Sequence, residues 1–171
     1  KFFLKESIWN VAYKKRNISY DLSKLNVIKN RTKCFNADPF IFKFQNNNYL
    51  FVENYSFKKK RGNISVYKIF DDKYEFLGDA LIEKFHLSFP FVFSYNEKIY
   101  MCPETSELNE IRIYESTEFP LKWKYCKTLI QDISAADTIL FEQDNIWWLF
   151  TNVDLSNIND HNSELSIYYS N

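Results

Sequence analysis

The chain has 171 residues, and its 22 basic and 22 acidic side chains give a formal net charge of +0. A balanced charge lacks the basic patch that nucleic-acid binding requires, and no apolar run approaches the roughly 18 residues of a membrane-spanning helix. Hydrophobic residues make up 46% of the chain and aromatic residues 19%, which excludes a disordered protein and favours strands over helices. We therefore expect neither a nucleic-acid partner nor a membrane span.

The chain repeats itself from residue 37 onward, after a strand-like stretch at residues 8–13. Three segments align without a gap, and the same register continues seven residues later. Each copy predicts a strand, a tight Asn-bearing turn and a second strand, followed by a third strand. The predicted first strands are 37–42, 88–93 and 136–141, the second strands include 49–51, 100–102 and 148–150, and the third strands include 64–67, 111–114 and 165–168. Fourth strands are expected at 74–77 and 121–125. Trp148 falls in a second strand, so we expect it in the core.

Four short strands that recur about every 50 residues are typical of a β-propeller blade. We expect an all-β fold in which the chain is a single β-propeller domain or part of one. The blade-like units lie at about 37–85, 88–134 and 136–171, with 1–36 as a partial blade or lead-in. Propellers close with about 4–8 blades, so the chain covers about three blades of a larger ring. The alternative is a meandering β-sandwich whose hairpins are similar by coincidence.

Acidic residues occupy equivalent positions in the repeat. Asp38, Phe89 and Asp137 begin the innermost strands, which run side by side around a propeller axis. Fifteen residues later come Glu53, Glu104 and Asn152, at the open ends of the hairpins. His86 precedes the second inner strand, and a basic run that includes Arg61 lies in a loop leaving the same rim. We expect these side chains to gather at one rim of the channel. Taken alone, the basic run is more typical of a solvated loop.

Clustered carboxylates in an aromatic cavity are what glycoside cleavage requires, because one protonates the leaving oxygen and another acts as base or nucleophile. We assign Asp38, Asp137 and Glu104 as candidate catalytic residues. The candidate substrate-binding residues are Glu53, His86, Asn152 and Arg61. The alternative is that the aspartates cap turns at the strand entries by accepting hydrogen bonds from nearby backbone N–H groups.

The cysteines and histidines indicate no metal site. Cys34, Cys102 and Cys126 form no C-x-x-C pair, and the chain has only two histidines, His86 and His161. A structural zinc site therefore has too few ligands, and we expect no metal and no other cofactor. Buried, reduced thiols suggest a reducing compartment, and we expect a cytoplasmic protein.

Several short motifs resemble one protein family. The motifs are Ala37–Phe40, His86–Val92, Pro103–Thr105, Phe119–Pro120 with Trp123, and Ala136–Thr138. They resemble the N-terminal domain of plant glucosamine inositolphosphorylceramide transferases and bacterial relatives in which that domain is fused to formyltransferase-like modules. That domain is similar in turn to the five-bladed furanosidases, including glycoside hydrolase family 43.

The resemblance implies a five-bladed furanosidase-like propeller and particular site residues. Asp38 matches the family 43 base, and Asp137 matches the aspartate that modulates the pKa of the general acid. The general acid belongs to the next blade in that pattern, and Glu104 is the nearest candidate here without occupying its position. This departure puts hydrolysis in doubt and leaves sugar recognition.

Two functions from different classes remain open. One is a carbohydrate-binding or carbohydrate-active propeller of a glycan-building protein, with a sugar, glycan or nucleotide sugar as ligand. If it is an enzyme, it is glycoside hydrolase-like or an accessory domain of a glycosyl- or formyltransferase. The alternative is a non-catalytic scaffold that positions a fused transferase domain.

Overall fold

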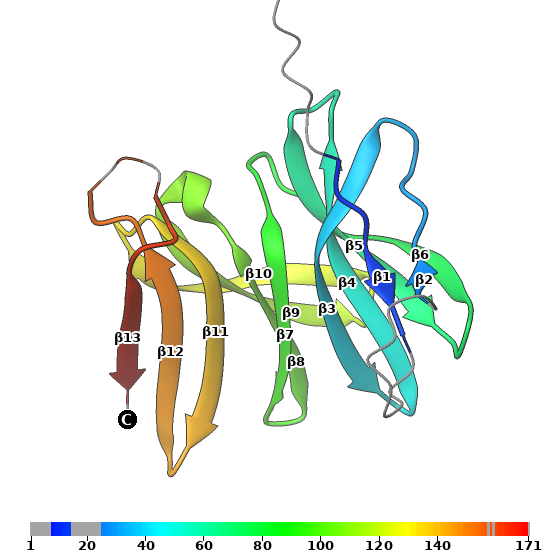
Figure 1. The fold of residues 1–171 in the computed structure, drawn as a ribbon. Helices are drawn as coiled ribbons and strands as arrows, with labels where there is room; N and C mark the ends of the chain where they lie inside the picture. The colour runs from blue at the N-terminus through cyan, green and yellow to red at the C-terminus, as the bar shows by residue number, and fades with distance from the viewer. Residues whose placement is uncertain (1–7, 15–24, 157, 159, 171) are drawn as a thin grey trace, which may run out of the picture.

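The computed structural model describes residues 8–14, 25–156, 158 and 160–170, and three antiparallel sheets make up most of this part of the chain (Figure 1). Within each sheet the strands are hydrogen-bonded in chain order, so each sheet is an up-and-down meander. Blade 1 contains β3 (Cys34–Phe44), β4 (Asn47–Ser56), β5 (Arg61–Ile69) and β6 (Tyr74–Leu81). Blade 2 contains β7 (Ser88–Tyr95), β8 (Lys98–Glu104), β9 (Glu110–Glu118) and β10 (Lys122–Gln131), with a short 3-10 turn, η2 (Ser106–Leu108), before β9. Blade 3 contains β11 (Ala135–Gln143), β12 (Ile146–Val153) and β13 (Leu165–Ser170).

The first strand of each blade lies innermost. The strands β3, β7 and β11 stand next to one another, with β7 contacting both of the others. Their hairpin turns all lie at one end of the molecule, the lower end in Figure 1. Each turn is a two-residue loop with both residues in the left-handed region, which Asn and Asp tolerate better than most residues. The turn residues are Gln45–Asn46, Asn96–Glu97 and Asp144–Asn145.

Apolar faces pack between successive blades. Phe51 and Val66 of blade 1 meet Val92 and Met101 of blade 2 in one core cluster. A second cluster joins blades 2 and 3, with Cys102, Ile111 and Ile113 against Leu140 and Leu149. Sheets packed face to face around adjacent inner strands are the architecture of a propeller. The prediction of an all-β propeller chain with about three blades is confirmed.

The lead-in segment covers the free face of blade 1. It contributes two short paired strands, β1 (Ala12–Tyr13) and β2 (Asn26–Val27). Val11 and Ile28 beside these strands are buried against Leu50 and Val52. Arg31 anchors the segment, because its guanidinium donates hydrogen bonds to Asn54 Oδ1 (2.6 Å) and to the Asp79 carboxylate (2.8 Å). The rest of the predicted lead-in, residues 1–7 and 15–24, lies outside the described residues.

Two expectations about burial were wrong. Trp148 is half-buried and contacts Tyr169, at a ring-centroid distance of 5.8 Å. The reason is that its neighbour Trp147, whose side chain lies on the opposite face of β12, is the tryptophan that packs against the core between blades 2 and 3. Among the cysteines, which are all free thiols, only Cys102 is fully buried, and Cys126 is exposed. No helix in the described part of the chain is long and apolar enough to cross a bilayer.

Candidate functional site: an acidic rim above the inner strands

The three inner strands carry the same bulge at the same repeat position. In β3, Ala37 pairs with Glu53 and the next pair is Phe40 with Phe51, so Asp38 and Pro39 together face a single residue of β4. The pairing of β7 and of β11 skips two residues in the same way. The first bulged residue is left-handed in each strand: Asp38 (φ 46°), Phe89 (φ 42°) and Asp137 (φ 55°). Bulges of this kind turn side chains away from the regular alternation and are frequent next to active sites.

Phe89 is the outlier among the three. Asp tolerates the left-handed region, but a bulky residue such as Phe adopts it only where the surroundings enforce it, at a cost of about 1–3 kcal/mol. Part of the compensation is visible, since the Phe89 N–H donates to Asp38 Oδ2 at 3.2 Å. Blades 1 and 2 are therefore joined at the bulge by a hydrogen bond to a carboxylate.

The bulges surround a cavity at the rim. It has a volume of about 260 Å³, and its walls are carboxylates, prolines and phenylalanines from all three inner strands. The lining residues are Asp38, Pro39, Phe40, Phe89, Pro90, Phe91 and Asp137. Asp38 and Asp137 line this cavity together, as predicted. The other residues expected at the rim, Glu53, Glu104 and His86, do not line it.

Two glutamates lie behind these aspartates. Glu53 is only 7% exposed, and burial raises its pKa to about 8, with Asp38 and Glu104 adding repulsion. Burial also raises the pKa of Glu104, against the hydrogen bond that Ser106 Oγ donates to its carboxylate at 2.8 Å. The pKa of Asp137 is raised by burial and by the charge of Asp38. These carboxyls influence one another's protonation, so they form one electrostatic cluster.

Asn152 belongs to this rim as well. It pairs with Ala136 in the β11–β12 ladder, and its Nδ2 donates to Asp137 Oδ2 at 3.4 Å. The Asn152 amide therefore orients the carboxylate of Asp137, a residue that lines the cavity.

His86 connects the rim to Glu53. Its Nδ1 accepts a hydrogen bond from the Gly62 N–H at 2.9 Å, and its Nε2 lies 3.4 Å from Glu53 Oε1. Since Nδ1 accepts, we assign the ring proton to Nε2, where it faces Glu53. Burial lowers the pKa of His86. The backbone N–H of His86 donates to Glu107 Oε2 at 2.7 Å, which fixes the residue in place.

Gly62 is a site residue that the sequence did not reveal. A Cβ at this position would lie 2.4 Å from the Leu87 carbonyl oxygen and 2.7 Å from Glu53 Oε1. Only glycine allows β5 to approach the Glu53 carboxyl this closely. The sequence pointed to Gly62 only through the rarity of glycine, since the chain has only two glycines.

His161 is the second residue that the sequence did not assign. It lies in the β12–β13 connection, where its Nε2 is 2.9 Å from Ser134 Oγ. Burial raises the pKa of both Glu104 and Asp137, and an electrostatic interaction with His161 offsets part of that increase. Both histidines of the chain therefore adjoin the acidic rim.

Arg61 lies beside the site without lining the cavity. Its Nη1 donates to the Lys84 carbonyl oxygen, and so it braces the segment that leads to His86. The three lysines before it, Lys58–Lys60, are exposed in the β4–β5 turn. Among the described residues, no group of three or more His, Cys, Asp or Glu side chains is placed to hold a metal ion.

The arrangement offers both hydrogen-bond acceptors and donors. An ionised carboxylate accepts hydrogen bonds from hydroxyl or ammonium groups, and a carboxyl that stays protonated donates one. The phenylalanine and proline walls supply an apolar surface beside them. Such a combination suits a small polar ligand with one apolar face.

Solved structures show what the fold is similar to. The chain is similar to the GH32 β-fructofuranosidase of Bombyx mori, with a TM-score of 0.50 and 14% identity. The similarity covers 84% of this chain and 39% of the fructofuranosidase. At this identity the comparison supports the propeller fold alone.

Curated relatives are closer in sequence. The chain is 42% identical over 139 residues to glucosamine inositolphosphorylceramide transferase 1 of Oryza sativa subsp. japonica, and 38% identical over 138 residues to the Arabidopsis thaliana protein of the same name. Each match covers 80% of this chain but spans only 18% of the relative. The family model described as glucosamine inositolphosphorylceramide transferase 1, N-terminal, matches residues 18–171. With a family model matching most of its length and relatives this similar, the chain belongs to the glucosamine inositolphosphorylceramide transferase 1 N-terminal family.

Proposed function

We propose that this chain is a carbohydrate-binding propeller unit of a glycan-building protein, and that the acidic rim cavity is its sugar site. The observation that carries the proposal is the convergence of Asp38 and Asp137, from different blades, on one cavity with phenylalanine walls. Sugars present hydroxyl groups at the ring edge and C–H groups on the ring face, which match carboxylates and aromatic rings respectively. The volume of about 260 Å³ lies just below the usual range of 300–1,000 Å³ for drug-sized ligands, so the cavity suits a single sugar ring.

The charge of the rim favours an amino sugar. Asp38, Asp137, Glu53 and Glu104 form an acidic cluster that a cationic ligand would relieve. The relatives are named glucosamine inositolphosphorylceramide transferase 1, and protonated glucosamine carries an ammonium group. We therefore propose that glucosamine, free or as part of a larger glycan or nucleotide sugar, binds more tightly than glucose or N-acetylglucosamine.

A catalytic role is the second candidate, and the protonation of Glu53 favours it. A carboxyl with a pKa near 8 beside other carboxylates has the properties of a general acid in glycoside cleavage. In this role Asp38 or Asp137 acts as the base. Because the chain spans 18% of its relatives, a transferase domain elsewhere in such a protein is the partner that this unit would serve.

Binding is tested by titration calorimetry with glucosamine, glucose and N-acetylglucosamine. We expect saturable binding of glucosamine that weakens at least tenfold, or about 1.4 kcal/mol, in Asp137→Asn. The matched control is Asp144→Asn, since Asp144 lies in the β11–β12 turn at the opposite end of the same strand. A chromogenic glycoside panel then tests cleavage.

A different result of these binding experiments would favour the alternative function, a non-catalytic scaffold. If none of the sugars binds and both Asp38→Asn and Asp137→Asn lower the melting temperature, the aspartates are caps of the bulged strands. The hydrogen bond from the Phe89 N–H would then be the function of Asp38.

A further inference from the structure

Basic side chains gather beside the acidic rim, at the end of blade 1 opposite the β3–β4 hairpin turn, which is the upper end in Figure 1. The β4–β5 turn at this end carries Lys58–Lys60, and Arg61 begins β5. Lys33, just before β3, and Lys84, between β6 and β7, belong to the same end. We call these five lysines and Arg61 the basic patch, which is a local excess of positive charge in a chain whose formal net charge is +0.

Hydrogen bonds connect the three segments that form the basic patch. The Phe57 N–H donates to the Lys33 carbonyl oxygen at 3.1 Å, and the Arg61 guanidinium donates to the Lys84 carbonyl oxygen. Lys60, in the left-handed region (φ 53°), closes the turn. The patch is therefore built on a fixed backbone path that joins three loops.

The lysines of the basic patch lack carboxylate partners. Their side chains are exposed, and the ion pairs of the described part of the chain all involve other residues. Neighbouring cations repel one another, and an anion bound among them would relieve this repulsion. Phosphate is such an anion, because lysine and arginine form charge-assisted hydrogen bonds with its oxygens.

The basic patch adjoins the acidic rim through His86. Arg61 directly precedes Gly62, whose N–H donates to His86 Nδ1 at 2.9 Å. The ring centroid of Tyr55 lies 6.1 Å from that of His86 and 6.0 Å from that of Phe57, the residue before the lysines. One ligand can therefore contact the rim and the patch without leaving this end of blade 1.

Glu53, the carboxyl beside His86, does not oppose an anion at the patch. Its pKa of about 8 keeps it protonated at neutral pH. The charges along this end of the molecule thus change from the aspartates of the cavity, through the uncharged pair of Glu53 and His86, to the cations of the patch. This order matches a ligand with a cationic group and an anionic group at its two ends.

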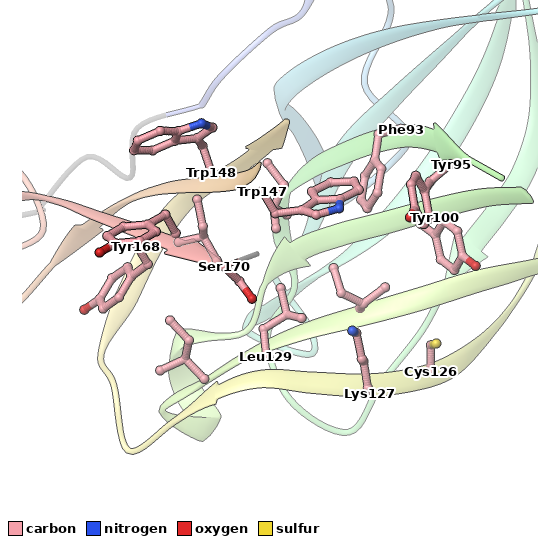
Figure 2. A pocket seen from close by; sticks show the side chains of 15 residues that line it. Phe93, Tyr95, Tyr100, Cys126, Lys127, Leu129, Trp147, Trp148, Tyr168 and Ser170 are labelled. Atoms are coloured by element: carbon pink, nitrogen blue, oxygen red, sulfur yellow. The ribbon is translucent and has the colours of Figure 1, made fainter. Parts of the chain in front are cut away.

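A larger cavity between blades 2 and 3 offers no such pattern (Figure 2). Its volume is about 710 Å³, and its lining is mainly aromatic and aliphatic, with side chains such as Phe93, Trp147 and Tyr168. Among the described residues of this lining, Lys127 is the only charged one. A ligand that carries both charges is matched by the rim and the basic patch, and not by this cavity.

We propose that the basic patch binds the phosphate group of an amino sugar whose ring occupies the acidic rim cavity, so that the ligand is a phosphorylated amino sugar. This inference rests on the proposed function of the rim and adds a second binding region to it. Asp38 and Asp137 attract the ammonium group, while the patch attracts the phosphate. A neutral sugar lacks both charges, and a phosphorylated neutral sugar offers the aspartates only hydroxyl groups.

Titration calorimetry that compares glucosamine with glucosamine 6-phosphate and glucosamine 1-phosphate tests the proposal. The two phosphates distinguish a phosphate at the far side of the ring from one at the anomeric carbon, where nucleotide and lipid carriers are attached. We expect one of them to bind at least tenfold more tightly than glucosamine at low salt. The gain should shrink as salt is added, because the lysines are exposed. In Lys58→Gln/Lys59→Gln the phosphorylated sugar should bind no more tightly than glucosamine does.

Two control variants remove charge elsewhere. Lys43→Gln/Lys73→Gln removes the same charge from exposed lysines at the opposite end of blade 1, next to the β3–β4 and β5–β6 turns. Lys127→Gln removes the cation of the larger cavity. Both variants should keep the tighter binding of the phosphorylated sugar.

Four outcomes would overturn the proposal. Equal affinities for glucosamine and both phosphates would do so and would leave the glucosamine site standing, as would a gain that persists in Lys58→Gln/Lys59→Gln. A gain that disappears in Lys127→Gln would move the ligand to the larger cavity. If inorganic phosphate binds as tightly as the phosphorylated sugar and Asp137→Asn changes neither affinity, the patch binds anions independently of the rim. If no amino sugar binds, with or without phosphate, the proposed function of the rim fails as well.

Discussion

Burial and repulsion from neighbouring carboxylates both raise the pKa of Glu53. Its carboxyl is buried, Gly62 packs directly against it, and His86 Nε2 lies 3.4 Å from its Oε1. With a pKa of about 8, the residue keeps its proton at neutral pH. The pair of Glu53 and His86 is thus uncharged, and a proton is held beside two aspartates at the cavity.

This protonation predicts how stability depends on pH. In the unfolded chain Glu53 ionises near its ordinary value of 4.5, whereas in the folded chain it ionises near 8. Between these values the folded state binds more protons, so the free energy of unfolding falls as the pH rises and levels off above about 8. In Glu53→Gln this decline should be reduced, with the largest stabilisation at pH 8 and little at pH 4.

The measurement is the melting temperature of both proteins between pH 4 and 9. For a domain of this size, 1 kcal/mol corresponds to a shift of roughly 2–4 °C. Asp144→Asn, in the distant turn, should keep the original pH dependence. Parallel curves for Glu53→Gln and the unchanged chain would mean that Glu53 ionises normally.

The sequence predicted the rim aspartates because equivalent positions of a repeat occupy equivalent places in space. The shared location of Asp38 and Asp137 could be predicted from that symmetry alone, without knowledge of any contact. Gly62 and His161 have no repeat partners, and their roles depend on loops whose path the repeat does not specify. Arg61 was assigned by its charge, but its hydrogen bond to a backbone carbonyl could not be read from composition.

The hairpin is the element at which sequence and structure agree best. Two-residue turns and bulges fix the register of each inner pair, and the turn residues were visible as Asn and Asp in a chain with few glycines. Burial was harder to predict, as Trp148 shows. Its strand and register were correct, but the packing of a blade face depends on the neighbouring sheet, which no local pattern describes.

The β9–β10 hairpin should contribute more to stability than the outermost strand does. Phe119 packs against four aromatic rings of blade 1, whereas Tyr169 is 70% exposed. Because Phe119 is half-buried, Phe119→Ala should cost about 2–3 kcal/mol, below the 3–5 kcal/mol of a fully buried phenylalanine. Tyr169→Ala should cost about 0.5 kcal/mol or less. Urea unfolding of both variants measures the difference, and equal costs would show that blades 1 and 2 are not held together at this hairpin.

Across the whole molecule, burial falls from blade 1 to blade 3. Most of β5 is buried, between the lead-in segment and blade 2, while five of the six residues of β13 are exposed. Local opening requires less free energy where fewer apolar contacts break. Hydrogen exchange followed by mass spectrometry should therefore be slowest in β4 and β5, intermediate in β8 and β9, and fastest in β13. Uniform exchange would indicate that the three blades open as one unit.

The acidic cavity is assembled from Asp38 of blade 1, Phe89 of blade 2 and Asp137 of blade 3. A ligand that touches both aspartates can bind only while three separate sheets keep their positions. Ligand binding in the cavity and the packing of the three sheets are then linked by mass action. A ligand at 100 times its dissociation constant stabilises the packed sheets by about 2.7 kcal/mol. The linkage is reciprocal, which means that a substitution such as Phe119→Ala, far from any bound sugar, would weaken binding by loosening the packing between blades.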